Sequence, residues 1–274
     1  MYNFRASDGT ILAYRDLGCG IPVLCLAGLT RNSSDFVGLE NSFRDTRLIM
    51  MDYRGRGESD WDINSLAYTT EKEADDAFEL LDHLDIDRVH IIGTSRGGLV
   101  AMKMATIARG RIDGILFNDI GPEIETAGIQ RIFDHLGRNP EYQNLEDAAK
   151  QLASIAHGFR DVSMRQWRRE AENRYRFAGC RLNIRYDPGL RWACIHTAAL
   201  QNLDLWQEFK ALNGMNLALI RGENSDVLSS ETAANMQLAC PDLIITTARN
   251  RGHCPFLDEP ESQQAIARFL VARS

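Results

Sequence analysis

The chain has 274 residues, of which 44% are hydrophobic and 25% are charged, and its formal net charge is -7. This composition excludes a low-complexity or fibrous chain and is typical of a globular protein with a large buried core. The negative charge opposes binding to phosphate backbones, so we expect no nucleic-acid partner.

The cysteine pattern and the apolar runs predict the cellular location of the protein. The six cysteines contain no C-x-x-C pair, which argues against a zinc site and a disulfide framework and favours reduced thiols in the cytoplasm. The N-terminal residues, MYNFRASDGTILAY, hold no signal-peptide-like apolar run. The longest nearly apolar stretch, residues 21–29, is too short to span a bilayer, so we expect no membrane partner.

The predicted elements alternate between short apolar strands and helices. Residues 3–17 alternate around Asp8-Gly9, which predicts an antiparallel hairpin. The elements expected after it are, in chain order, strands at 22–28 and 47–53, a helix at 69–84, a strand at 88–95, a helix at 99–108, strands at 112–119 and 216–222, a helix near 230–239, a strand at 242–248 and a helix at 259–271. This rhythm predicts an α/β fold with a mainly parallel sheet covered by helices on both faces.

Residues 122–205 interrupt the rhythm. They are expected to be mostly helical with no clear strand, and their basic and acidic residues nearly balance. We therefore expect a core domain of residues 1–121 and 206–274, with 122–205 inserted as a helical cap, or lid. Trp167 and Trp192 are the predicted walls of a pocket under this lid, although tryptophans at helical spacing also pack structurally.

Gly93-Thr94-Ser95-Arg96-Gly97 fits the pattern G-x-S-x-G. It follows a predicted strand and precedes a predicted apolar helix, so Ser95 is expected on a sharp strand-to-helix turn. The helix that starts there offers free N–H groups and the positive end of its dipole to an oxyanion. This context favours Ser95 as a nucleophile over a serine that only caps the helix.

A serine nucleophile needs a base, and His253 is the histidine best placed for this role. It lies in a loop after the predicted strand 242–248, which opens at the same carboxyl edge of the sheet as Ser95. Two histidines, His83 and His90, fall within predicted elements and are more typical of structural roles. The other three, His135, His157 and His196, fall in the insertion.

The third partner must orient the histidine and stabilise its cation. Asp226 follows the strand 216–222 and gives the chain order Ser95, Asp226, His253, which is the hydrolase order. Two alternatives also follow strands of this sheet: Glu223 in the same loop, and Asp119 at the end of ILFND.

Four segments together resemble the α/β-hydrolase fold superfamily over nearly the whole chain. They are DYRGRGESD (52–60), GTSRGG, GENSDVL and RGHCPFLDEPE, in the order found in that family. The resemblance implies that Ser95 is the nucleophile, Asp226 the acid and His253 the base. The segment 52–60 is expected to have a structural role.

One segment departs from the family pattern. Where the family usually has His-Gly, this chain has Ala27-Gly28-Leu29-Thr30. The backbone N–H of Leu29 is still expected to form the oxyanion hole with that of Arg96. Thr30 or Asn32 could replace the missing histidine as a brace, and the Arg96 side chain is free to pair with an acid or to pack.

The serine in the elbow excludes the aspartate chemistry of dehalogenases and most epoxide hydrolases of this fold. The expected function is therefore hydrolysis of a small carboxylic ester, thioester or lactone through an acyl-enzyme on Ser95. The alternatives are a C–C bond hydrolase and a catalytically silent ligand-binding or signalling protein on the same scaffold. No cofactor or metal is expected, the partner is a small-molecule substrate, and a homo-oligomer is compatible with the sequence.

Overall fold

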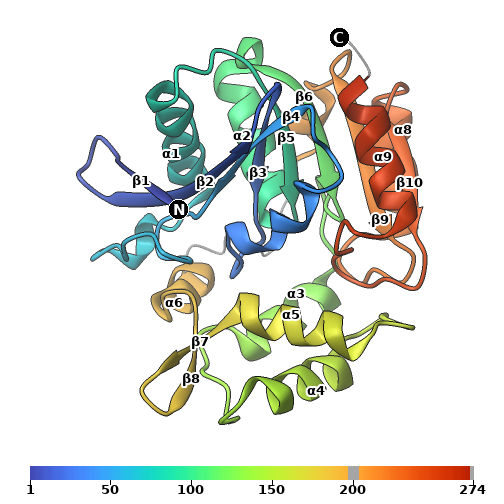
Figure 1. Ribbon diagram of the computed structural model, residues 1–274. Coiled ribbons are helices and arrows are strands. Elements are labelled where there is room, and N and C mark those ends of the chain that lie inside the picture. Colours follow the sequence, from blue (N-terminus) through green and yellow to red (C-terminus); the bar gives the residue numbers. More distant parts are fainter. Residues whose placement is uncertain (197–203, 272–274) are drawn as a thin grey trace.

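The computed structural model describes residues 1–196 and 204–271. Eight strands form one sheet in the order β1-β2-β4-β3-β5-β6-β9-β10 (Figure 1). Their bounds are β1 (Tyr2–Arg5), β2 (Ile11–Gly18), β3 (Ile21–Leu26), β4 (Thr46–Met51), β5 (Val89–Thr94), β6 (Ile112–Asn118), β9 (Asn216–Gly222) and β10 (Ile244–Ala248). Strands β1 and β2 form the predicted antiparallel hairpin and β2 runs antiparallel to β4. Every pair from β4 to β10 is parallel, so the predicted, mainly parallel sheet is confirmed.

Helices cover both faces of this sheet. They are α1 (Thr70–His83), α2 (Arg96–Ala108), α7 (Trp206–Lys210), α8 (Ser230–Ala239) and α9 (Pro260–Val271), with short 3-10 turns η1 (Ser33–Leu39), η2 (Ser65–Ala67) and η3 (Arg109–Arg111). Their apolar stripes explain their positions. For example, α1 buries Ala74, Ala77 and Leu81 at helical spacing, and the Thr69 hydroxyl caps its start.

The buried residues divide into two clusters because successive side chains of a strand point to opposite faces. In β3, Leu24 and Leu26 belong to the cluster that α1 and α2 cover. Val23 and Cys25 belong to the cluster on the other face, which α9 and η1 cover. Two-sided burial accounts for the continuous apolar runs of the parallel strands.

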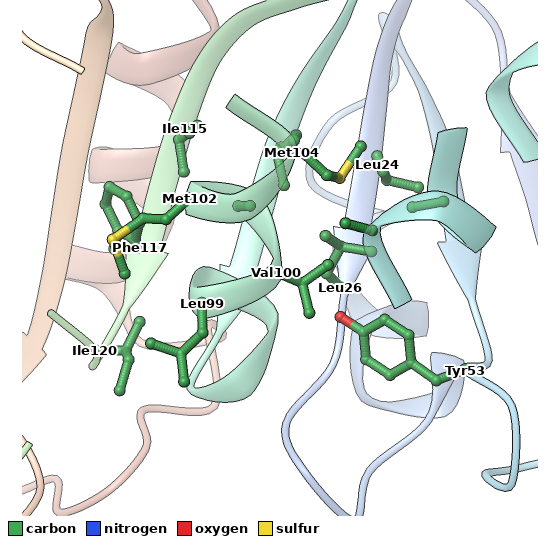
Figure 2. Close-up of a cluster of buried hydrophobic side chains, with 14 of the residues drawn as sticks. Leu24, Leu26, Tyr53, Leu99, Val100, Met102, Met104, Ile115, Phe117 and Ile120 are labelled. Atoms are coloured by element: carbon green, nitrogen blue, oxygen red, sulfur yellow. The ribbon is translucent and has the colours of Figure 1, made fainter. Parts of the chain in front are cut away.

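Helix α2 is the central helix of the first cluster and begins directly after Ser95. Figure 2 shows Met102 of this helix beside Phe117 of β6, and Val100 beside Leu26 of β3. The helix thus packs on the sheet face over β5 and the two strands that flank it, which fixes the position of its N-terminus. That N-terminus is the part of the helix that the site uses.

The chain between β6 and β9 forms a second layer, which lies below the sheet in Figure 1. We call it the inserted layer. Its elements are α3 (Thr126–His135), α4 (Leu145–Ile155), α5 (Met164–Arg174), β7 (Tyr175–Ala178), β8 (Arg181–Ile184) and α6 (Gly189–His196). It has a small core of its own, formed by Ala148, Ala149, Leu152, Trp167, Ala171 and Leu182.

The expectation that residues 122–205 hold no clear strand is wrong. Strands β7 and β8 form an antiparallel hairpin that turns at Gly179, whose φ of +63° suits glycine. The residues of β7 are mostly exposed and include an arginine, so the apolar alternation that would have revealed this strand is missing. Residues 197–203 of the predicted insertion lie outside the described residues, and the domain boundaries stay a prediction.

Among residues 1–196 and 204–271, no helix combines the length and apolarity needed to cross a membrane.

Candidate active site

Ser95 occupies a sharp turn between β5 and α2. Its φ of 51° and ψ of -117° are strained values for a residue with a side chain. The turn depends on its glycines, since a Cβ on Gly97 would lie 2.0 Å from the Leu26 carbonyl oxygen. A Cβ on Gly93 would likewise lie 2.6 Å from the carbonyl oxygen of Gly97. The predicted elbow is therefore present, and it presents the serine at the carboxyl edge of the sheet.

The structure brings His253 to Ser95. The imidazole Nε2 lies 2.9 Å from the serine Oγ, although 158 positions separate the two residues in the chain. His253 lies in the loop between β10 and α9, as the sequence predicts. The contact has the length of a hydrogen bond through which a base can take the serine proton.

The other imidazole nitrogen meets Asp119, which follows β6. Nδ1 of His253 lies 2.8 Å from Oδ2 of this fully buried carboxylate. The same carboxylate accepts hydrogen bonds from the Gly222 backbone N–H at 2.8 Å and from the Ser225 hydroxyl at 2.7 Å. These donors hold the carboxylate in place, and the carboxylate in turn orients the imidazole.

The prediction that Asp226 is the partner of His253 is therefore corrected. The Asp226 carboxylate turns toward the inserted layer, where Oδ2 lies 2.6 Å from Nε of Arg131 and 3.7 Å from Nδ1 of His157. Its neighbour Ser225 occupies the loop position that faces Asp119. The alternative Glu223 is not the partner either, because His253 Nδ1 contacts Asp119, while the Glu223 carboxylate accepts the Asn250 backbone N–H at 2.8 Å.

The two predicted oxyanion donors flank the serine. Leu29 lines the same cavity as Ser95, and a Cβ on the preceding Gly28 would lie 3.8 Å from the Ser95 Cβ. Arg96 is the first residue of α2, where a helical N–H has no acceptor within the helix. Among the described residues, neither of these two N–H groups has a hydrogen-bond partner.

The loop that carries Leu29 is braced without the histidine that the family usually has. Asn32 accepts the Ser34 N–H at 3.1 Å and donates to the Asn173 carbonyl at 2.9 Å, so one of the two expected braces contributes. The other, Thr30, lines the cavity. Asp52, from the segment 52–60, accepts the Ser33 N–H at 2.6 Å.

The Arg96 side chain points away from the site into the core. It is buried, and its Nε lies 2.6 Å from the Glu73 carboxylate, so the expected pairing with an acid is confirmed. The residue after the nucleophile thus has two separable parts. Its backbone N–H begins α2 directly after Ser95, and its side chain anchors the start of α2 to α1.

A cavity of about 550 Å³ opens in front of Ser95, between the sheet edge and the inserted layer. Its apolar wall is formed by Leu29, Ile132, Leu136, Leu152, Phe159, Trp167, Val227, Phe256 and Leu257. Trp167 is 6% exposed and packs against Phe159 and Phe256, so it lies where the sequence placed it. Trp192 is not part of this wall: it is 55% exposed and stacks on His196.

One charged cluster joins the inserted layer to the loop between β3 and η1, residues 27–32, which we call the oxyanion loop. Arg31 lies 2.5 Å from Asp35 and 2.8 Å from Glu170 of α5. Burial opposes the positive charge of Arg31, but the negative charges of Asp35 and Glu170 outweigh this effect and raise the pKa of Arg31. Burial likewise works against the Glu170 charge, and Arg31 and Arg174 outweigh it and lower the pKa of that carboxyl.

Cys254 is the other nucleophilic side chain beside His253. Burial raises the pKa of its thiol to about 12, so the thiol is protonated at neutral pH. The thiolate is the reactive form of cysteine, so burial keeps Cys254 unreactive, whereas the Ser95 hydroxyl has the imidazole Nε2 within 2.9 Å.

A model of the alpha/beta hydrolase family matches residues 23–265, which is most of the chain. The chain belongs to the alpha/beta hydrolase family. It is thus an α/β-fold hydrolase, as the sequence predicts, and the mostly parallel sheet and its covering helices are those of the family.

One curated relative and two solved structures are similar to this chain. A curated relative, the 3-hydroxybutyrate-oligomer hydrolase of Cupriavidus necator, is 29% identical over 254 residues, which cover 89% of this chain and 86% of that protein. The crystal structure of an alpha/beta hydrolase from Novosphingobium aromaticivorans superposes with a TM-score of 0.91 at 34% identity, covering 98% and 96% of the two chains. E-2-(acetamidomethylene)succinate hydrolase shares the fold with a TM-score of 0.83 at 22% identity, covering 99% of both chains.

Proposed function

We propose that this hydrolase cleaves small carboxylic esters, thioesters or lactones through an acyl-enzyme on Ser95. The observation that carries the proposal is the continuous chain from Ser95 through His253 to Asp119, with contacts of 2.9 and 2.8 Å. Folding does not require a buried carboxylate, an imidazole and a strained serine in line. Their alignment argues against the silent binding protein and in favour of catalysis.

The mechanism follows from these positions. Ser95 Oγ attacks the substrate carbonyl carbon while His253 Nε2 takes the hydroxyl proton, and Asp119 stabilises the resulting imidazolium. The tetrahedral oxyanion accepts hydrogen bonds from the Leu29 and Arg96 N–H groups. His253 then gives the proton to the leaving alkoxide or thiolate, and the acyl group remains on Ser95. A water molecule, deprotonated by His253, attacks the acyl carbon. The bond from that carbon to Ser95 Oγ then breaks, His253 returns the proton to Oγ, and the acid is released.

The cavity and the curated relative narrow the substrate class. A cavity of about 550 Å³ lies within the size range of small-ligand sites, and its wall is mainly apolar. The relative of similar length is named as a hydrolase of 3-hydroxybutyrate oligomers, which are short chains joined by ester bonds. We therefore propose short aliphatic esters, including short oligoesters of hydroxy acids, as the preferred substrates.

A substrate panel tests this function. It compares the wild type with Ser95→Ala on p-nitrophenyl esters of graded acyl length, on lactones, and on short 3-hydroxybutyrate oligomers. We expect wild-type turnover and a loss of at least about a thousandfold in kcat for Ser95→Ala. Full activity in Ser95→Ala would overturn the mechanism. Turnover of a vinylogous diketone without any ester hydrolysis would instead identify a C–C bond hydrolase.

A further inference from the structure

Arg56 is buried beneath the oxyanion loop and contacts it directly. This residue comes from the segment 52–60, which the sequence assigned only a structural role, and its side chain is 1% exposed. Its Nε donates to the Leu29 carbonyl oxygen at 3.0 Å, and its Nη1 donates to the Arg54 carbonyl at 2.8 Å. Leu29, whose N–H is a predicted oxyanion donor, is therefore held in place by the hydrogen bond from Arg56 to its carbonyl oxygen.

The remaining nitrogen of Arg56, Nη2, is linked through Glu73 to Arg96, the residue with the second predicted oxyanion donor. Nη2 lies 2.8 Å from Oε1 of Glu73, a fully buried carboxylate on α1. The other oxygen of Glu73 lies 2.6 Å from Nε of Arg96, and Arg96 Nη2 donates to the Tyr68 carbonyl at 2.9 Å. An unbroken buried path thus runs from Leu29 through Arg56 and Glu73 to Arg96.

We propose that Arg56 is a positioning residue of the oxyanion hole, which with Glu73 sets the separation of the Leu29 and Arg96 N–H groups. The proposal rests on the proposed function, because it gives these two groups their role. They lie on different segments, one on the loop after β3 and one at the start of α2. The path through Arg56 and Glu73 ties these two segments together by side chains, in addition to the packing around them.

Arginine is the residue type that this position requires. Its planar fork presents nitrogens in fixed directions, and here Nε and Nη1 donate to two backbone carbonyls while Nη2 forms an ion pair with Glu73. The rings of Tyr53 and Tyr68 flank the guanidinium, with centroids 5.6 and 5.2 Å from its central carbon. A lysine keeps the positive charge in this enclosure, but its single nitrogen cannot hold Leu29 and Glu73 in the same geometry.

The chain offers a matched control two residues earlier. Arg54 is also fully buried, and its guanidinium pairs with Asp76 at 2.7 Å and Asp62 at 2.6 Å. Among the described residues, no hydrogen bond or ion pair joins these acids to Leu29, and the contact from Arg54 to the Arg56 guanidinium is made by the Arg54 backbone carbonyl. Arg54→Lys therefore damages a buried ion pair of the same kind without loosening the oxyanion loop.

The experiment compares Arg56→Lys with Arg54→Lys by thermal unfolding and by steady-state kinetics on p-nitrophenyl acetate. We expect both variants to lose stability. Only Arg56→Lys should lose kcat and kcat/KM together, on the order of 100-fold, with KM unchanged, which is the signature of a contact that matters only in the transition state. Equal kinetic constants in the two variants would overturn the proposal.

A second variant covers the case in which Arg56→Lys does not fold. Glu73→Asp shortens the carboxylate by one methylene, so it cannot reach both guanidinium groups, and it should show the same paired loss of kcat and kcat/KM. Unchanged kinetics in a folded Glu73→Asp would also overturn the proposal. A wild type that neither turns over esters nor reacts with a fluorophosphonate would refute the proposed function itself. An active wild type with equal kinetic constants in Arg56→Lys and Arg54→Lys would instead refute only the positioning role of Arg56.

Discussion

The Ser225 hydroxyl donates a hydrogen bond of 2.7 Å to the Asp119 carboxylate, across the loops that follow the adjacent strands β6 and β9. Asp119 presents its carboxylate to His253 from one loop, and the Ser225 hydroxyl supports that carboxylate from the other. The carboxylate that faces His253 thus comes from the strand before the inserted layer.

Exchanging the two candidate acids for their amides tests this arrangement. Asp119→Asn should lower kcat about ten-thousandfold, the effect of the equivalent change in serine proteases, because the amide leaves the imidazole in the wrong tautomer. Asp226→Asn removes an ion pair to Arg131, which is 47% exposed, and should change kcat by less than about fivefold. A larger loss of kcat in Asp226→Asn than in Asp119→Asn would contradict this arrangement and support Asp226 as the partner of His253.

The site shows which features a sequence reveals and which it does not. Ser95 and His253 were predictable because each lies at a loop whose position follows from the strand before it. The acid was not, because β6 and β9 are neighbours and each is followed by an aspartate at the same edge of the sheet. Which aspartate turns inward depends on the φ of +57° at Asp119 and on the hydroxyl of Ser225, and neither has a sequence signature.

Two other misses have similar causes. Trp192 was expected in the pocket because it is a large aromatic residue in the insertion, but it is part of α6, where it faces outward. The contact from Arg56 to Leu29 joins residues 27 positions apart, and only the folded chain shows it. The strands of the main sheet and the helices around it, in contrast, follow from periodicity that is local in the sequence.

Substituting Gly97 tests the packing of the elbow. Gly97→Ala would place a Cβ 2.0 Å from the Leu26 carbonyl oxygen, and backbone cannot yield as a flexible side chain can. We expect a loss of about 3 kcal/mol or more in the free energy of unfolding, and a loss of activity as the oxyanion loop shifts. Gly110→Ala is the control, because nothing lies within 4 Å of its added Cβ, and it should stay within about 1 kcal/mol of the wild type. Urea unfolding gives both values, and equal effects would contradict the packing argument.

Glu170 tests the joint between the inserted layer and the oxyanion loop. Glu170→Gln removes one of the two carboxylates that pair with the buried Arg31, and Asp35 remains, so it should cost about 2 kcal/mol of unfolding free energy. Glu172→Gln on the same helix breaks a pair with Arg168 that is 37% and 50% exposed, and should cost less than about 1 kcal/mol. Denaturant titration of the two variants checks the difference, and a smaller loss in Glu170→Gln than in Glu172→Gln would refute it.

His90 makes stability depend on pH. It lies in β5 with its ring against Phe269, and burial lowers the pKa of its imidazole below the unfolded value of about 6.5. The unfolded chain therefore binds a proton before the folded protein does, so stability is full above pH 6.5 and falls as the pH drops from there toward the folded pKa.

Thermal unfolding of His90→Gln across this pH window checks the assignment. The melting temperature of the variant should fall less steeply below pH 6.5 than that of the wild type, whatever its absolute value. His135→Gln, at an exposed position, serves as the control and should keep the wild-type slope. An unchanged slope in His90→Gln would show that another group carries the pH dependence.

The most direct test of the central claim is covalent labelling with a fluorophosphonate, followed by mass spectrometry of the intact protein and its peptides. The wild type should gain one adduct, located on Ser95, and ester turnover should stop in proportion to labelling. Ser95→Ala should gain none, and Asp119→Asn should react far more slowly than Asp226→Asn. An unlabelled wild type, or an adduct on any residue other than Ser95, would contradict the account.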